Sequence, residues 1–181
     1  MSRAGRAGCV GIAAIFSLAV PTAAFAQTEP RASVAGGYVY AYQPGSGEIE
    51  GTPYAAGWLA TAAVRLGSSR FSAAGEFGLS WRRNAFDETQ QLTTVLGGAR
   101  VALARSTRLT LFAQALAGLE RFSEPGLAES GVAVQPGIGV DIHMSPRVFI
   151  RAQGDYRWSH PNGATFHTVR GVAAIGVNLG R

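Results

Sequence analysis

The stretch RFSAAGEFGLSWR at residues 70–82 decides the fold, because its side chains alternate between two kinds. Phe77 and Trp81 share one face with smaller apolar residues. Glu76 and Arg82 lie on the opposite face, among serine, alanine and glycine. A period of two residues is typical of a β-strand whose two faces meet different surroundings. The stretch therefore predicts a strand with one bulky apolar face and one small, polar face.

The same alternation recurs along the chain. It is clear at residues 108–121 and 147–158, where apolar side chains occupy one parity and polar or small ones the other. Five weaker segments complete a set of eight, at residues 31–42, 54–66, 91–104, 132–143 and 166–179. Each segment is a little longer than the roughly 9–11 residues that a tilted strand needs to cross a bilayer. We therefore expect an all-β protein with eight antiparallel strands.

The connections between these segments alternate in length. The long ones are residues 43–53, 83–90, 122–131 and 159–165, and the three-residue ones are 67–69, 105–107 and 144–146. Outer-membrane barrels have short periplasmic turns and longer outer loops. The sequence therefore predicts an eight-stranded, up-and-down transmembrane β-barrel whose first and last strands have their free ends in the periplasm. The first and third long loops are expected to be acidic, the third through Glu124 and Glu129.

Residues 1–26 have the pattern of a secretory signal peptide. Two arginines precede an apolar run at residues 10–20, and small residues then suit cleavage before Gln27. The alternative, an N-terminal membrane anchor, normally needs about 20 apolar residues. Cys9, the only cysteine, lies in the segment to be removed. We expect residues 27–181 to form one domain without thiol chemistry.

The low charge content indicates which face looks inward. Only 15 % of the residues are charged, which is low for a soluble domain. An eight-stranded barrel has room for little more than its own side chains, so the face of small and ionised residues suits the lumen. We expect the bulky face to contact acyl chains. A soluble barrel with the two faces reversed is the alternative.

Ionised residues inside the lumen must pair, because an isolated buried ion costs several kcal/mol. The predicted lumen polar network consists of Glu76, Arg100, Gln114, Glu120, Asp141, Arg151, Gln153, Asp155, Arg157 and Arg170. Adjacent strands favour three pairs, namely Glu76 with Arg100, Asp141 with Arg151, and Asp155 with Arg170. Such a network would plug the lumen, whereas a gated ion path needs a continuous wet channel.

Aromatic residues are expected at the ends of the strands next to the long loops. The predicted aromatic girdle consists of Tyr40, Tyr42, Tyr54, Trp81 and Trp158. Tyrosine and tryptophan are enriched where a membrane meets water. Every basic residue is an arginine, and the arginines are spread one or two per segment with no cluster along the sequence. We therefore expect no nucleic-acid partner.

Two runs resemble a known family. GIGVDIHMS at residues 137–145 and RAQGDYR at residues 151–157 resemble the sixth and seventh strands of OmpA-like outer-membrane β-barrel proteins, a porin family of small eight-stranded barrels. The resemblance implies location in the bacterial outer membrane and insertion by the outer-membrane assembly machinery. Outer-membrane lipids and lipopolysaccharide would be its partners. The resemblance says little about activity, and our first hypothesis is a non-enzymatic barrel with a role in envelope structure or surface interaction.

Histidine raises the question of catalysis. His160 loosely follows the His-x-Ser-Asn pattern of lipid A deacylases, but Asn162 stands where that pattern has its serine. His143 falls at a periplasmic turn, and His167 has no carboxylate predicted beside it. Three dispersed histidines predict neither a metal site nor a cofactor. A lipid A-modifying enzyme using His160, a soluble lipocalin-like periplasmic carrier and a narrow channel are alternatives to the non-enzymatic barrel.

Overall fold

The computed structural model describes residues 30–44, 52–54, 56–83, 89–161 and 165–180. The signal peptide expected at residues 1–26 lies outside this range. The strands are β1 (Ala32–Gln43), β2 (Thr52–Tyr54), β3 (Ala56–Arg65), β4 (Phe71–Arg83), β5 (Thr89–Arg105), β6 (Leu109–Glu124), β7 (Leu127–His143), β8 (Val148–Pro161) and β9 (Phe166–Leu179). In the described part of the chain, no helix has the length and apolar character needed to span a bilayer.

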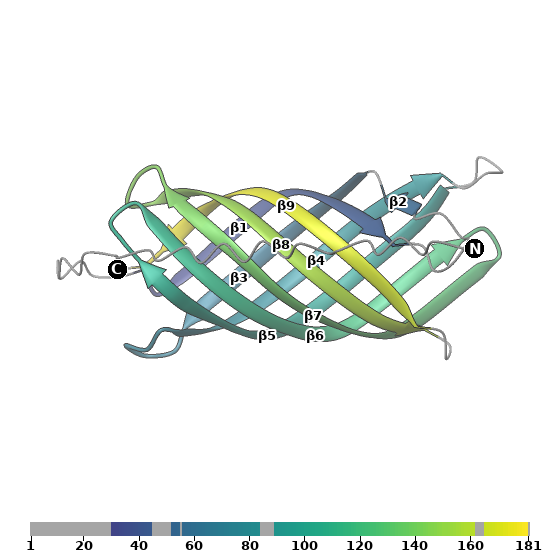
Figure 1. The fold of residues 1–181 in the computed structure, drawn as a ribbon, viewed down its shortest axis with the longest axis horizontal. Coiled ribbons are helices and arrows are strands. Elements are labelled where there is room, and N and C mark those ends of the chain that lie inside the picture. Colours follow the sequence, from purple (N-terminus) through teal and green to yellow (C-terminus); the bar gives the residue numbers. More distant parts are fainter. Residues whose placement is uncertain (1–29, 45–51, 55, 84–88, 162–164, 181) are drawn as a thin grey trace, which may run out of the picture.

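The strands form a closed antiparallel barrel (Figure 1). Each strand from β3 to β8 pairs with the next one along the chain, and β1 closes the sheet by pairing with both β3 and β9. The short β2 lies beside β1 in line with β3, so the nine labelled strands occupy eight positions around the barrel. The predicted eight-stranded up-and-down architecture is confirmed. The strand expected at 54–66 is present as β2 and β3, on either side of residue 55.

The two ends of the barrel differ. Residues 66–70, 106–108 and 144–147 connect strands at one end, where β1 begins and β9 ends. We call this the short-connection end. At the opposite end, which we call the long-connection end, the chain passes from β1 to β2, from β4 to β5 and from β8 to β9 (Figure 1).

The prediction of a third long loop at residues 122–131 is wrong, because strands occupy most of this range. β6 continues to Glu124 and β7 begins at Leu127, and these two residues are paired across a two-residue turn. Gly126 has φ of 82°, the left-handed conformation that glycine adopts without steric cost. Glu124 and Glu129 therefore lie in a β-hairpin. Proline followed by glycine favours a turn at Pro125-Gly126, and the polar residues on either side of it pair as strands.

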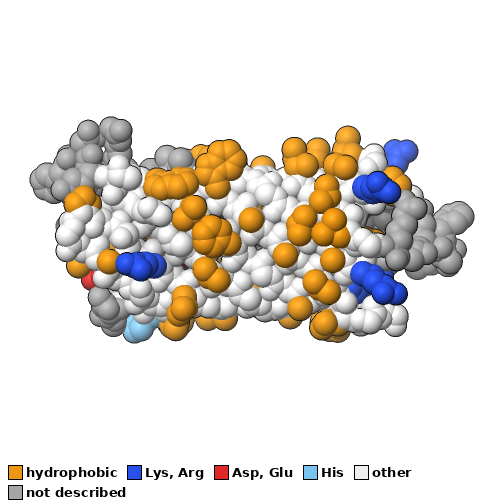
Figure 2. Space-filling view, turned by 180° about the vertical axis from the view of Figure 1, so that it is seen from behind, with side chains coloured by type: hydrophobic (Ala, Val, Ile, Leu, Met, Phe, Trp, Pro, Cys, Tyr) orange, Lys and Arg blue, Asp and Glu red, His pale blue; other side chains and the backbone are white. Residues whose placement is uncertain are grey.

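The two faces of the sheet have the predicted orientation. Phe77 and Trp158 are 45 % and 37 % exposed, whereas Glu76 and Arg151 are 3 % and 1 % exposed. Figure 2 shows hydrophobic side chains over the middle of the outer face and arginine at its ends. The bulky apolar residues thus look outward and the ionised ones inward, as insertion in a membrane requires.

The lumen also holds large apolar side chains, which the sequence analysis did not expect there. Phe112 and Phe149 are fully buried, and Val39, Leu59 and Val172 pack with Phe149 in one apolar cluster. A second cluster combines Leu96 and Leu116 with three alanines. These residues have the same inward parity as the other buried residues of their strands. The error was to treat the inward face as only small or ionised.

Candidate functional site

The lumen network is built from alternate residues of six strands. All ten predicted members point inward from β4 to β9 and are buried. The structure adds Gln135 of β7, which is 0 % exposed. Its parity along β7 is that of Asp141, so the period of two could have identified it.

Gln135 lies at the centre of one cluster. Its side-chain oxygen accepts hydrogen bonds from Arg157 Nε at 2.9 Å and Nη2 at 2.7 Å, and from Arg170 Nη1. Its amide nitrogen donates to the two carboxylate oxygens of Glu76 at 3.3 and 3.4 Å. Glu76 also accepts a hydrogen bond from Arg170 Nη1 at 2.8 Å and lies 3.6 Å from Arg157 Nη2. One uncharged amide thus connects one carboxylate with two guanidinium groups.

Two further carboxylates surround this cluster. Glu120 accepts a hydrogen bond from Arg157 Nη1 at 3.0 Å. Asp155 lies 3.9 Å from Arg170 Nη1 and accepts hydrogen bonds from Gln153 Nε2 at 2.9 and 3.0 Å. A Cβ on Gly137 would lie 2.0 Å from Asp155 Oδ1, so the glycine provides the space that this carboxylate occupies. The cluster therefore includes two arginines and three carboxylates.

A second cluster contains the other two lumen arginines. Arg151 donates to both carboxylate oxygens of Asp141, at 2.7 and 2.8 Å, and to the Thr61 hydroxyl at 3.1 Å. Arg100 donates to Gln114 Oε1 at 3.2 and 2.7 Å. Both guanidinium groups lie over the Phe112 ring, with Cζ 4.3 Å (Arg100) and 4.9 Å (Arg151) from its centroid. Cation–π attraction of this kind stabilises charge where water is scarce.

Two of the three expected ion pairs occur, Asp141 with Arg151 and Asp155 with Arg170. The pair expected between Glu76 and Arg100 is wrong. The register places Leu96 opposite Glu76 and Ser72 opposite Arg100, so the two charges are separated along their adjacent strands. Arginines from β8 and β9, reaching across the lumen, are the partners of Glu76.

The lumen network as a whole is electrically balanced. Four carboxylates lie with four arginines, and hydrogen bonds connect them to glutamine and threonine side chains. Among the described residues, no three His, Cys, Asp or Glu side chains are grouped so that they could hold a metal ion. The arrangement connects strands across the lumen through hydrogen bonds and ion pairs.

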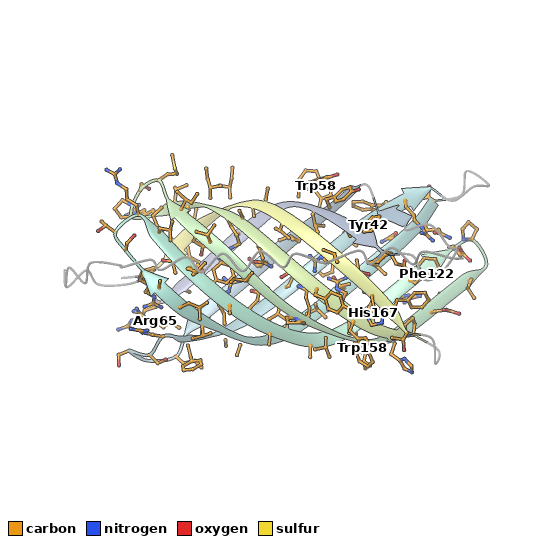
Figure 3. All side chains as sticks on the ribbon, in the orientation of Figure 1. Tyr42, Trp58, Arg65, Phe122, Trp158 and His167 are labelled. Carbon is orange, nitrogen blue, oxygen red and sulfur yellow. The ribbon has the colours of Figure 1, made fainter. Side chains whose placement is uncertain are left out.

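The outward aromatic residues gather near the long-connection end. Tyr40, Tyr42 and Trp158 are exposed, and Trp81 is half-buried. The side chain of Tyr54 lies outside the described residues. Trp58, which was not among the predicted girdle residues, is also exposed, and Figure 3 shows it on the same half of the barrel as Tyr42 and Trp158.

The three histidines contact hydroxyl and aromatic groups. His160 Nδ1 lies 3.1 Å from the Thr165 hydroxyl, and its ring stacks on Trp158. His167 Nδ1 lies 2.5 Å from the Tyr156 hydroxyl, and His143 Nε2 lies 3.1 Å from that of Thr110. Within the described part of the chain, none of them contacts a carboxylate. The hydroxyl partners of the three histidines in the described part of the chain belong to threonine and tyrosine.

Four arginines that are far apart in the sequence lie at the same end of the barrel. Each stands directly before a strand that starts at the short-connection end, and we call them the arginine collar: Arg31, Arg70, Arg108 and Arg147. Arg65 and Arg105 end strands there as well. The arginines do not cluster along the sequence, but residues about 40 positions apart come to the same end of the barrel because the hairpins repeat.

Three solved structures share this fold over most of the chain. Neisserial surface protein A, NspA, has a TM-score of 0.68 at 13 % identity, covering 82 % of this chain and 97 % of its own. Ail, the attachment invasion locus protein of Yersinia pestis, has 0.57 at 17 %, covering 82 % and 98 %. The N-terminal β-barrel domain of Pseudomonas aeruginosa OprF has 0.56 at 10 %, covering 83 % and 98 %. The chain has the fold of the small outer-membrane β-barrels.

The resemblance to OmpA-like barrels is thus confirmed at the level of the fold. No family model matches the sequence, and no curated protein matches it. At identities of 10–17 %, the three structures establish the architecture alone. What this outer-membrane-type barrel does has to be argued from its own surfaces and its lumen.

Proposed function

We propose that the protein is a non-enzymatic integral barrel of the bacterial outer membrane, with a plugged lumen and a role in envelope structure or surface interaction. The observation that supports this most is the orientation of the two faces. Trp58, Leu119 and Ile175 are exposed on the outside, while paired ions fill the inside. An exposed apolar belt of this extent is a liability in water and a requirement in a bilayer.

The packed lumen supports a structural role over a carrier or a channel. A lipocalin-like carrier needs an internal apolar cavity, but here Phe112, Phe149 and the lumen network occupy the interior. A steady ion path would have to pass Gln135 and the arginines hydrogen-bonded to it. We therefore expect no steady single-channel conductance when the purified barrel is added to planar bilayers.

The long-connection end is where we place any surface interaction. The β6–β7 hairpin reaches beyond the pairing of its neighbours and has Glu124 and Glu129 near its tip. NspA and Ail, which share the fold, are described as a surface protein and an attachment invasion protein. By analogy, we expect the hairpin and the adjacent connections to face outward from the cell, and the short-connection end to face the periplasm.

Fractionation tests the proposed location. We expect the protein in the outer-membrane fraction, soluble only with detergent, and migrating differently on SDS gels before and after boiling. Recovery from the periplasm without detergent would instead support a soluble carrier. The enzymatic alternative is tested separately, by comparing lipid A masses from cells with the wild type and with His160→Ala. We expect identical spectra, because His160 contacts Thr165 and Trp158.

A further inference from the structure

The arginine collar is a regular feature of the barrel. β1, β4, β6 and β8 start at the short-connection end, and each is preceded by one collar arginine: Arg31, Arg70, Arg108 and Arg147. The backbone carbonyl of each accepts a hydrogen bond from the neighbouring strand, at 2.8–3.0 Å. The barrel register therefore fixes four guanidinium-bearing residues around the whole rim.

The collar lies where the apolar belt ends. All four side chains are exposed, and Phe71 and Leu109, which directly follow Arg70 and Arg108, are exposed apolar residues on the outer face. Met144, in the turn before Arg147, is exposed as well. Figure 2 shows arginine side chains gathered at this end, which is on the right in that view. On the proposed membrane location, the edge of the apolar belt is where lipid headgroups would begin.

Carboxylates do not neutralise the collar within the described residues. Four of the described acidic residues are buried in the lumen: Glu76, Glu120, Asp141 and Asp155. The other two, Glu124 and Glu129, lie in the hairpin at the long-connection end. Among the described residues, the short-connection end thus contains exposed arginines and no exposed carboxylate, although the lumen network is balanced.

We infer that the collar binds the phosphates of anionic glycerophospholipids in the periplasmic leaflet. Guanidinium groups bind phosphate oxygens through paired hydrogen bonds, and basic residues beside a membrane are attracted to anionic lipid. An acidic polymer or protein would be expected to bind a basic patch that is confined to one side of the barrel. The collar instead spans the full circumference beside apolar side chains, which fits an annulus of lipid. This inference rests on the proposed outer-membrane location.

The test measures which lipids stay bound. The folded protein is reconstituted in vesicles of phosphatidylethanolamine with a minority of phosphatidylglycerol, then extracted in mild detergent, and the retained lipids are quantified by mass spectrometry. We expect phosphatidylglycerol to be enriched roughly fivefold over its share in the vesicles. The combined Arg70→Gln, Arg108→Gln and Arg147→Gln variant should lose the enrichment, whereas lysine at the same three positions should keep most of it.

The matched control is Arg121→Gln, an exposed arginine of β6 near the long-connection end. It should leave the enrichment unchanged. The inference is overturned if the triple glutamine variant enriches phosphatidylglycerol as much as the wild type does. It is also overturned if Arg121→Gln loses as much enrichment as the triple variant. If the triple variant does not form a barrel, the enrichment of phosphatidylglycerol by the wild type is measured at increasing salt concentration. Salt weakens the binding of lipid to exposed charges, but it does not weaken apolar packing of lipid against the barrel. Enrichment that persists at high salt also overturns the inference. Failure of the wild type to insert would instead refute the proposed location.

Discussion

Glycine is used in opposite ways on the inner and outer faces of the barrel. A Cβ on Gly118, which has inward parity in β6, would lie 2.1 Å from the carbonyl oxygen of Val95. A Cβ on Gly171, which points outward from β9, would have no atom within 4 Å. The inner face is packed to its limit, so the identity of each residue matters there. The outer face requires only that side chains be apolar, because lipid adapts to their shape.

The largest effect should come from breaking the lumen network. Glu76→Ala removes the carboxylate that Arg157 and Arg170 share and leaves the balanced lumen network with one excess buried positive charge, which should lower the free energy of unfolding by about 3–5 kcal/mol. Denaturant unfolding in vesicles measures it. Glu129→Ala, in the hairpin outside the network, is the control and should cost less than about 1 kcal/mol. Similar losses of unfolding free energy in the two variants would show that the ion pairs in the lumen contribute no more to stability than an exposed charge does.

A charge on the outer face should have the next largest effect. Ile138 is an exposed outward residue in the middle of β7, and Ile138→Arg should destabilise the barrel by about 2–4 kcal/mol in a bilayer. Ile138→Leu, which keeps the apolar character, should be almost neutral. The same unfolding measurement applies. An Ile138→Arg variant as stable as the wild type would contradict contact between this face and lipid.

Extra volume on the inner face should have an intermediate effect. Gly118→Ala places a methyl group against the backbone of β5, so the strands must shift, and we expect a loss of about 1–3 kcal/mol. Urea midpoints of the folded protein in vesicles give the comparison. If Gly118→Ala is as stable as the wild type, the lumen can expand to accept the added methyl group.

The smallest effect is expected for the same substitution on the outer face. Gly171→Ala meets open space and removes a glycine from a strand interior, so stability should change by less than about 0.5 kcal/mol. Gly118→Ala serves as its partner in the same experiment. A loss as large as that of Gly118→Ala would remove the distinction between the faces.

The alternation of side chains predicted most of the architecture, because parity determines whether a residue such as Glu76 or Phe77 points inward or outward. Parity gives no information about register. The partner of Glu76 was therefore misassigned to Arg100, since the true partners reach across the lumen from β8 and β9.

The local sequence pattern also did not predict how far the strands extend or which distant residues meet in the barrel. The β6–β7 hairpin extends through residues with no apolar face, so its pairing depends on the neighbouring strand and not on burial. The collar depends on closure, because Arg31 and Arg147 are brought to the same rim only when β1 pairs with β9.

The position of the collar residues has a consequence for how such a barrel could change size. Each collar arginine directly precedes one strand that starts at the short-connection end, so every two-strand unit contains its own rim arginine. A barrel that gained or lost one such unit by duplication or deletion would keep a complete cationic rim, with the number of guanidinium groups rising or falling in step with its circumference.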